Sequence, residues 1–407
     1  MKTCPTKIEI LADQILQKLP GLSAWRHRFL LRLFVLWPAV LGRHNFVNFG
    51  RQGEYTEFTY RKHFAKRMDW LAFNLALLER YAGPDRIIAL DPSYLSKSGK
   101  HTAGVGYFHS GVAGKRKWGL EVTGLAAVDV KDKTAYHLEA VQTVGRLSDQ
   151  ESLLDYYADI IQERKEDLLK VSKYVVADAY FSRNPFIRRI VGTGFHLISR
   201  LRKNVCLRYF FTGEQKPKGR RKKFAGKVNL LALDQAVFSK IEALSSADTT
   251  VFSGIVELKA AGLAIKAVVV QKLNDQGEPT SVKVYMSTDT EQSAEEIIHA
   301  YRCRFQQEFI FRDAKQFVGL EEGQARDWPK IDFHVNASMT VVSLAKAAHH
   351  LCLPVDQRGA FSMSDITTAY ANERLALRIF RRCGIDPNRP KMKAVLAEVR
   401  NYAARAA

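Results

Sequence analysis

The chain has 407 residues, of which 46% are hydrophobic and 26% charged, a composition that excludes a wholly disordered chain and a bundle of membrane spans. Its 62 Lys and Arg outnumber its 42 Asp and Glu, giving a formal net charge of +20. This excess favours a polyanionic partner, because each neutralised phosphate releases condensed counterions. The scattered cysteines argue against a disulfide framework or a structural zinc site. With no signal peptide or membrane span predicted, we expect a cytoplasmic protein.

Helical signals fill the first 82 residues. Leu11, Ile15 and Leu19 repeat at helical spacing, and residues 61–80 form a second amphipathic stretch. The region is basic, and we interpret it as a helical N-terminal DNA-binding domain over 1–82. A helical scaffold with a solvated basic face is the alternative.

From residue 83 the pattern becomes that of an α/β core. The sequence predicts strands at 86–91, 105–109, 118–128, 134–141, 174–178 and 195–201, a helix at 151–169, and a second helix capped by Ser182 and running to Arg189. Asp91 and Asp178 each end a strand-like apolar run. These elements predict the first part of a core over 83–202.

A β-rich insertion is predicted at 203–287. It opens with a basic stretch, 202–228, that holds ten Lys and Arg against one Glu, and strands follow at 251–258, 263–272 and 282–286. The loop residues Arg220, Arg221, Lys222 and Lys223 are interpreted as DNA contacts, with a solvated loop as the alternative. The second part of the core is predicted at 288–330, and a helical C-terminal region at 331–407.

One polar stripe runs along the long helix predicted to begin near a capping box at Ser293 and Glu296. At about 100° per residue, five polar side chains share an arc about 80° wide between apolar flanks. This arrangement favours a helix lining a cleft, although an intrahelical ion-pair ladder is the simpler alternative. The five residues are Tyr301, Arg304, Glu308, Arg312 and Lys315.

Asp91, Asp178 and Glu308 are the candidate catalytic and metal-binding residues. If the strands at 86–91 and 174–178 are neighbours, both aspartates lie at one edge of the sheet, and Glu308 completes the set from a helix packed across it. Carboxylates brought this close repel one another, and a divalent cation removes the repulsion. Oxygen ligands of this kind suit Mg²⁺, with Mn²⁺ as a substitute, and two such ions catalyse in-line phosphoryl transfer. Glu121 and Asp129 are weighed as additional metal ligands, with edge or solvent placement preferred.

At these residues the chain resembles the DDE transposases of bacterial insertion sequences, in particular the IS-four family with its Tyr-(2)-Arg-(3)-Glu-(6)-Lys signature. The signature matches at Tyr301, Arg304, Glu308 and Lys315, and the two aspartates match in Leu90-Asp91-Pro-Ser-Tyr94 and Val176-Ala-Asp178-Ala-Tyr-Phe181. The resemblance covers roughly residues 85–330.

The resemblance implies an α/β fold with an RNase H-like catalytic core, a β-strand insertion, and flanking helical N- and C-terminal domains. It implies that Asp91, Asp178 and Glu308 hold two divalent ions and that Tyr301, Arg304 and Lys315 contact phosphates of the transposon end. It further implies cut-and-paste transposition of double-stranded DNA by a homodimer assembled on DNA.

Two points stay open at this stage. Family members that form a DNA hairpin hold a flipped base with an aromatic residue of the insertion, often Trp, but no Trp lies in 203–286. Phe210, Phe211, Phe252 and Tyr285 are the aromatic alternatives. The alternative functions are an RNase H-like nuclease that cuts without strand transfer and an inactive DNA-binding derivative.

Overall fold

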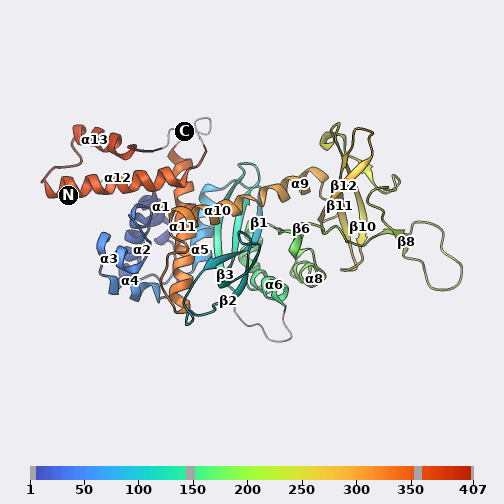
Figure 1. Cartoon of the computed structure of the whole chain (residues 1–407), viewed down its shortest axis with the longest axis horizontal. Coiled ribbons are helices and arrows are strands. Elements are labelled where there is room, and N and C mark those ends of the chain that lie inside the picture. Colours follow the sequence, from blue (N-terminus) through green and yellow to red (C-terminus); the bar gives the residue numbers. More distant parts are fainter. Residues whose placement is uncertain (1–5, 144–151, 353–359, 405–407) are drawn as a thin grey trace.

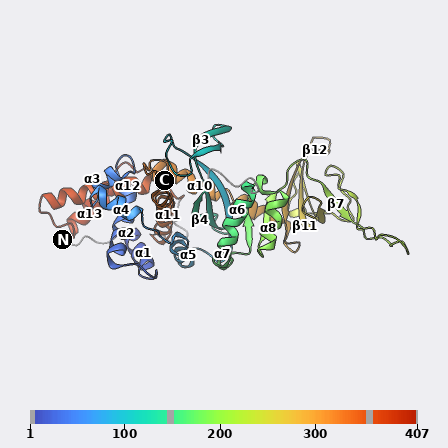
Figure 2. The ribbon, with the colours of Figure 1, turned by 90° about the horizontal axis from the view of Figure 1, so that it is seen from below.

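The computed structural model describes residues 6–143, 152–352 and 360–404. The molecule is elongated, with a helical region at one end, a sheet covered by helices in the middle, and a β-rich region at the other end (Figures 1 and 2). None of the described helices is long and apolar enough to cross a membrane.

The N-terminal region is a helical cluster around an aromatic core that includes Phe29, Trp37 and Phe64. The stretch predicted as one helix over 61–80 is two helices, because the side chain of Asp69 accepts the backbone N–H of Ala72 and caps a new helix there. The elements are α1 (Lys7–Leu16), α2 (Ala24–Leu36), η1 (Trp37–Ala39), α3 (Phe46–Gln52), α4 (Glu57–Phe64) and α5 (Trp70–Tyr81).

The described strands form one twelve-stranded sheet, in the order β2-β3-β1-β5-β6-β12-β11-β10-β7-β8, with β4 beside β3 and β9 beside β10. The pairs β1–β5 and β5–β6 are parallel, and the other pairs of described strands are antiparallel. The first core strand pairs with the strand before Asp178, which is the condition on which we expect the two aspartates to share an edge. The central strands are β1 (Arg86–Ser96), β2 (Gly106–Ser110), β3 (Lys115–Asp129), β4 (Thr134–Gln142), β5 (Tyr174–Val176) and β6 (His196–Arg200).

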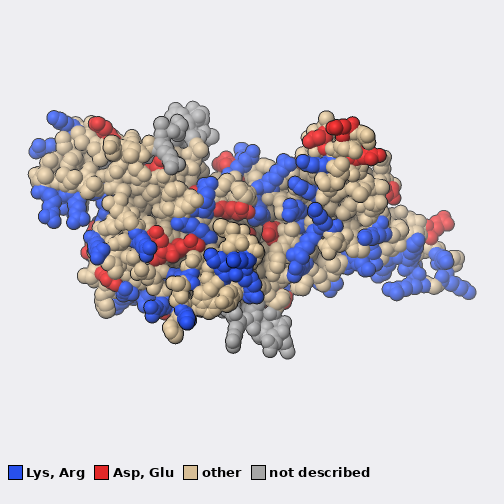
Figure 3. Space-filling model, viewed as in Figure 1, with Lys and Arg blue, Asp and Glu red and all other residues tan. Residues whose placement is uncertain are grey.

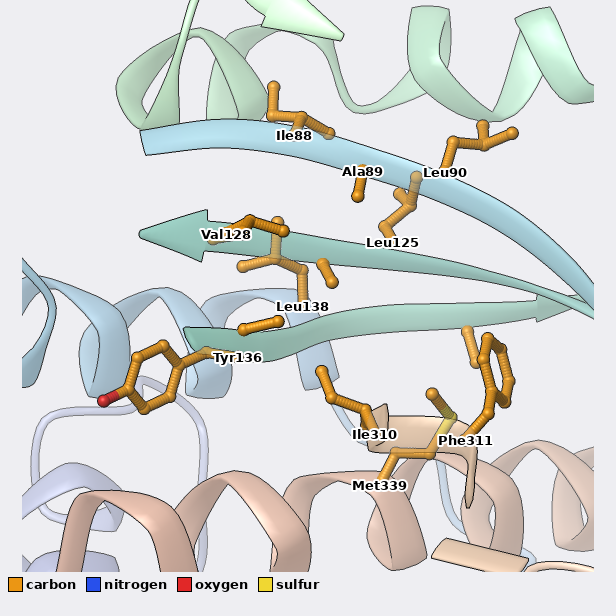
Figure 4. Close-up of a cluster of buried hydrophobic side chains, with 14 of the residues drawn as sticks. Ile88, Ala89, Leu90, Leu125, Val128, Tyr136, Leu138, Ile310, Phe311 and Met339 are labelled. Carbon is orange, nitrogen blue, oxygen red and sulfur yellow. The ribbon is translucent and has the colours of Figure 1, made fainter. Parts of the chain in front are cut away.

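Helices cover both faces of this central part. Figure 4 shows Ile88 and Leu90 pointing to the helices on one face, whereas Ile310, Phe311 and Met339 pack from the other. The predicted helix 151–169 is interrupted at Arg164 (Glu151 lies outside the described residues), and Arg183 rather than Ser182 precedes the following helix. The elements are α6 (Leu153–Glu163), α7 (Lys165–Val171), η2 (Ala179–Phe181) and α8 (Asn184–Gly192).

The insertion continues the same sheet. Strand β12 pairs with β6, with Tyr285 opposite Arg200 and Ser287 opposite Ile198. The loop between β7 and β8 extends from the far end of the molecule as an arm (Figure 1). The elements are β7 (Leu207–Phe210), β8 (Phe224–Lys227), β9 (Ser239–Lys240), η3 (Glu242–Leu244), β10 (Thr249–Leu258), β11 (Leu263–Leu273) and β12 (Pro279–Ser287).

After the insertion the chain is helical. The predicted capping box of Ser293 and Glu296 is confirmed, but the single long helix is wrong, because the helix breaks between Arg304 and Phe305. The elements are α9 (Ala294–Cys303), α10 (Gln306–Phe317), α11 (Trp328–Cys352), α12 (Met363–Arg382) and α13 (Pro390–Arg400).

Strand β4 has its outer edge covered by polar side chains instead of another strand. From α11, Asn336 accepts the backbone N–H of Ala140 at 2.7 Å and donates to its carbonyl at 2.9 Å, and Ser343 accepts the N–H of His137 at 2.8 Å. Asn74 of α5 donates to the carbonyl of Leu138 at 2.9 Å. Because these side chains satisfy buried backbone groups, α11 is fixed against the sheet.

Candidate active site

Asp91 lies inside β1, which has β3 on one side and β5 on the other. The expectation that the strand ends at this acid is wrong, because β1 continues through Pro92 to Ser96 while paired with β3. Pro92 has no backbone N–H to donate to a neighbouring strand. It is tolerated because β5 ends at Val176, so on that side no described strand pairs with β1 at Pro92. Asp91 stands opposite Gly124 of β3, so its side chain shares the face on which α10 packs.

Asp178 follows β5 by two residues, in register with Asp91. Ile88 pairs with Val175 and Ala89 with Val176 in parallel, so continuing the same register places residue 178 beside residue 91. Local bonds hold the acid in position: its Oδ1 accepts the backbone N–H of Tyr180 at 2.7 Å. The hydroxyl of Ser199 donates to its carbonyl oxygen at 2.9 Å.

Glu308 lies in the first turn of α10 and is joined to Asp91 through Arg304. The guanidinium of Arg304 contacts Glu308 Oε1 at 2.9 Å and Asp91 Oδ1 at 3.6 Å. The intrahelical ladder therefore exists only in part, since Arg304 also reaches across to β1, and Arg312 pairs with Asp313 at 2.9 Å. Arg304 Nε is buried without a hydrogen-bond partner among the described residues.

Gly124 sets how closely α10 approaches the sheet. The amide of Gln307 donates to the Gly124 carbonyl at 2.7 Å. A Cβ at position 124 would lie 2.7 Å from the Phe311 ring, closer than packed atoms allow. The absence of that side chain lets α10 bring Glu308 over Asp91.

Burial and neighbouring charges shift the pKa values of Asp91 and Arg304. Burial raises the pKa of Asp91 to about 7; Arg304 opposes the shift, and Asp178, Glu308 and Glu121 add to it. Burial disfavours the charge of Arg304, but Asp91 and Glu308 outweigh it and raise the pKa of the guanidinium. The site therefore favours a cation close to Asp91.

The donor chemistry fits a divalent cation, although the present side-chain arrangement does not form a metal-binding group. Within the described residues, no three His, Cys, Asp or Glu side chains are placed to share an ion. The positive charge between Asp91 and Glu308 is supplied by Arg304. All three candidate acids offer carboxylate oxygens, the ligands that Mg²⁺ and Mn²⁺ prefer.

The other residues of the predicted stripe make contacts outside the group of acids. Tyr301 is half-buried and its ring contacts that of Tyr285 from the insertion, with centroids 5.1 Å apart. Lys315 donates to the carbonyl of Tyr94 on β1 at 2.7 Å. Arg312 is half-exposed over the ring of Phe309, so the structure does not bring it to the acids.

The basic loop lies far from the acids. Arg220, Arg221, Lys222 and Lys223 are exposed on the arm between β7 and β8, at the opposite end of the insertion from β6 (Figure 1). Figure 3 shows this arm as a run of Lys and Arg. Lys222 stacks over the Phe211 ring at 4.6 Å.

Glu121 is buried, so the preferred placement at an edge or in solvent is wrong. Its Oε1 accepts hydrogen bonds from Tyr157 at 2.6 Å and Thr143 at 2.9 Å. It lies three residues from Gly124 on β3. Its side chain therefore points to one face of the sheet and the side chain of Asp91 to the other. Asp129 is also buried, and its Oδ2 accepts the backbone N–H of Gly83 at 2.7 Å.

Sequence reasoning gave no role to Lys97 or Glu321. Glu321 lies beside Lys315, and Lys97 donates to the carbonyl of Gly323, two residues after Glu321. Glu321 Oε1 is 3.7 Å from Lys315 Nζ and accepts the backbone N–H of Ser96 at 3.3 Å. The two segments are separated by more than two hundred residues, and neither carries a periodic signal that relates it to the other.

Comparison with known proteins supplies one match. The sequence profile of a family described as "Transposase DDE domain" matches residues 83–344, which include β1 to β12, α9, α10 and most of α11. No curated protein matches the chain.

Proposed function

The chain belongs to the transposase DDE domain family, and we propose that it cleaves insertion-sequence ends and joins their 3′-hydroxyl groups to target DNA by metal-dependent phosphoryl transfer. The observation that carries this proposal is the approach of Asp91, Asp178 and Glu308 from three separate elements. The in-register pairing of β1 with β5 and the contacts of Arg304 support it.

We also propose that the central part is an RNase H-like core. The order β4-β3-β1-β5-β6, with β3 the strand that runs opposite to the others, supports this assignment. The signature spacing of Tyr301, Arg304, Glu308 and Lys315 supports membership of the IS-four group. Residues 1–82 and the arm of the insertion are the proposed additional DNA-binding regions, and the active assembly is a homodimer on DNA.

Asp91, Asp178 and Glu308 would hold two divalent ions. Bound there, such ions activate a water or a 3′-hydroxyl and stabilise the leaving oxygen. For the carboxylates to face the ions, the guanidinium of Arg304 must leave Asp91 and Glu308. Its planar set of donors is then free for a phosphate of the DNA strand, which it can bind through two parallel hydrogen bonds.

Tyr301 of α9 and Lys315 of α10 lie on either side of Arg304 in the chain and would position the DNA strand. The contact of Tyr301 with Tyr285 places an insertion aromatic beside the signature residues. Among the four aromatic alternatives, Tyr285 is therefore the one that we propose stacks on a displaced base if excision proceeds through a hairpin.

The test uses the purified protein with Mg²⁺ and a DNA fragment that carries the inverted repeat flanking the coding region. Asp178→Asn and Glu308→Gln should abolish nicking at the ends, because each removes a charge needed to hold the ions, and neither should lower DNA affinity, because each keeps the side-chain shape. Glu295→Gln, on the exposed first turn of α9, is the matched control. Nicking without joined products would favour a nuclease, and metal-independent binding without nicks would favour an inactive DNA-binding derivative.

A further inference from the structure

Beyond Asp91, the end of β1 carries a second group of charged residues. Lys315 of α10 lies above it, and the loop after α10 brings Glu321 alongside. Glu321 Oε1 accepts the backbone N–H of Ser96 at 3.3 Å and lies 3.7 Å from Lys315 Nζ. Glu321 also acts electrostatically on Lys97, the next residue along the chain. One carboxylate thus contacts an ammonium group and a backbone N–H, with a second ammonium group within its electrostatic reach.

The lysines do not depend on Glu321 for their positions. Lys315 donates to the Tyr94 carbonyl at 2.7 Å, and Lys97 donates to the carbonyl of Gly323. Backbone oxygens therefore fix both ammonium groups, whereas the side chain of Glu321 is 36% exposed. If Glu321 turned outwards, Lys315 and the N–H of Ser96 would stay in place beside an open position, with Lys97 held nearby by the Gly323 carbonyl.

The charge in this group is not balanced. The single carboxylate of Glu321 stands against two cations, Lys97 and Lys315, and burial lowers the pKa of both lysines. Two ammonium groups and a backbone N–H are the donors that recur at DNA phosphates. A phosphate would satisfy them better than the single carboxylate does, because it brings more acceptor oxygens.

We propose that Ser96 N–H, Lys97 and Lys315 form a binding site for a DNA backbone phosphate, which Glu321 occupies as an anionic stand-in when no DNA is bound. This inference rests on the proposed function. Five residues of extended strand separate Asp91 from Ser96, which is about 17 Å at about 3.3 Å per residue. That length equals the axial rise of about five base pairs, so one duplex can reach both the acids and this site.

The experiment measures the affinity of the full-length protein for a 30-base-pair duplex by fluorescence anisotropy. Glu321→Gln removes the competing charge and keeps the shape, so affinity should rise roughly fivefold, the size of effect expected of one partly exposed ion pair. Glu278→Gln, in the exposed turn between β11 and β12, changes the net charge equally and is the matched control. Lys97→Gln should lower affinity, and lower it more in the Glu321→Gln background, where the lysine is no longer neutralised.

The outcomes separate this inference from the function on which it rests. If Glu321→Gln binds the duplex no more tightly than Glu278→Gln does, or Lys97→Gln binds as well as the unchanged protein, the stand-in role is refuted while DNA binding itself stands. If the unchanged protein binds no duplex, the proposed function fails and this inference fails with it. Thermal unfolding of each variant verifies that the fold is intact.

Discussion

Asp91→Asn should make the metal-free protein more stable at neutral and alkaline pH. Burial raises the pKa of Asp91 from its ordinary 3.8 to about 7, so ionising this side chain costs the folded protein more than it costs the unfolded chain. At about 1.4 kcal/mol for each tenfold change in proton affinity, the difference corresponds to up to about 4 kcal/mol of unfolding free energy. Asparagine has no proton to lose, so the variant escapes this cost.

The sign follows from the raised pKa. Below about pH 4, the Asp91 carboxyl is protonated in both the folded and the unfolded state, and it adds no pH dependence. Between about pH 4 and pH 7, the unfolded chain is ionised while the folded protein keeps the proton, so the wild type loses stability as the pH rises. The stability gap between Asp91→Asn and the wild type should therefore widen over that range and level off above it.

Urea unfolding with EDTA at about pH 4.5, 6 and 7.5 measures this gap. Asp275→Asn, in the exposed turn between β11 and β12, is the control and should show no widening. Adding Mg²⁺ at pH 7.5 should stabilise the wild type more than Asp91→Asn, since binding at a hundred times the dissociation constant contributes about 2.7 kcal/mol. A gap that does not change with pH would refute the reasoning that Asp91 carries the electrostatic strain of the site.

Two further predictions concern the packing that supports the site. Gly124→Ala places a Cβ 2.7 Å from the Phe311 ring and should displace α10 and Glu308, so cleavage should fall at least about tenfold while duplex affinity changes little. Gly111→Ala, whose Cβ meets nothing within 4 Å, is its control, and equal cleavage by the two variants would contradict the argument. Asn336→Ala leaves the edge groups of Ala140 unpaired and should lower the urea-unfolding free energy by about 3 kcal/mol. An unchanged midpoint would show that other groups satisfy that edge.

The sequence predicted best where local periodicity carries the signal. The strand cores around Asp91 and Asp178, the three long strands of the insertion and the Ser293 capping box are all found in the structure. Each depends on residues within a few positions of one another: alternating apolar side chains for strands, or a hydroxyl three residues before a carboxylate for the cap. The order of the acids and the spacing of the signature were likewise readable from the sequence.

The remaining features depend on contacts between distant segments. The helix breaks after Arg304, a position without Gly or Pro, where the same side chain reaches Asp91 more than two hundred residues earlier. Strand β1 continues past Pro92 because β3 supplies a partner along its whole length. Glu121 is buried because Tyr157 and Thr143 satisfy it. Propensity and patterning within a window of residues contain none of this information.

The pairing of β6 with β12 has a mechanical consequence. Because β12 is hydrogen-bonded to β6, the insertion is joined to the strands beside the acids through the sheet itself, and the arm between β7 and β8 lies at the far end of that sheet (Figure 2). If the arm binds DNA as proposed, a duplex that contacts both the acids and the arm must present its phosphates at one set spacing. The protein would then discriminate between duplexes by their length and curvature, because a bent or shortened duplex would lose one of the two contacts.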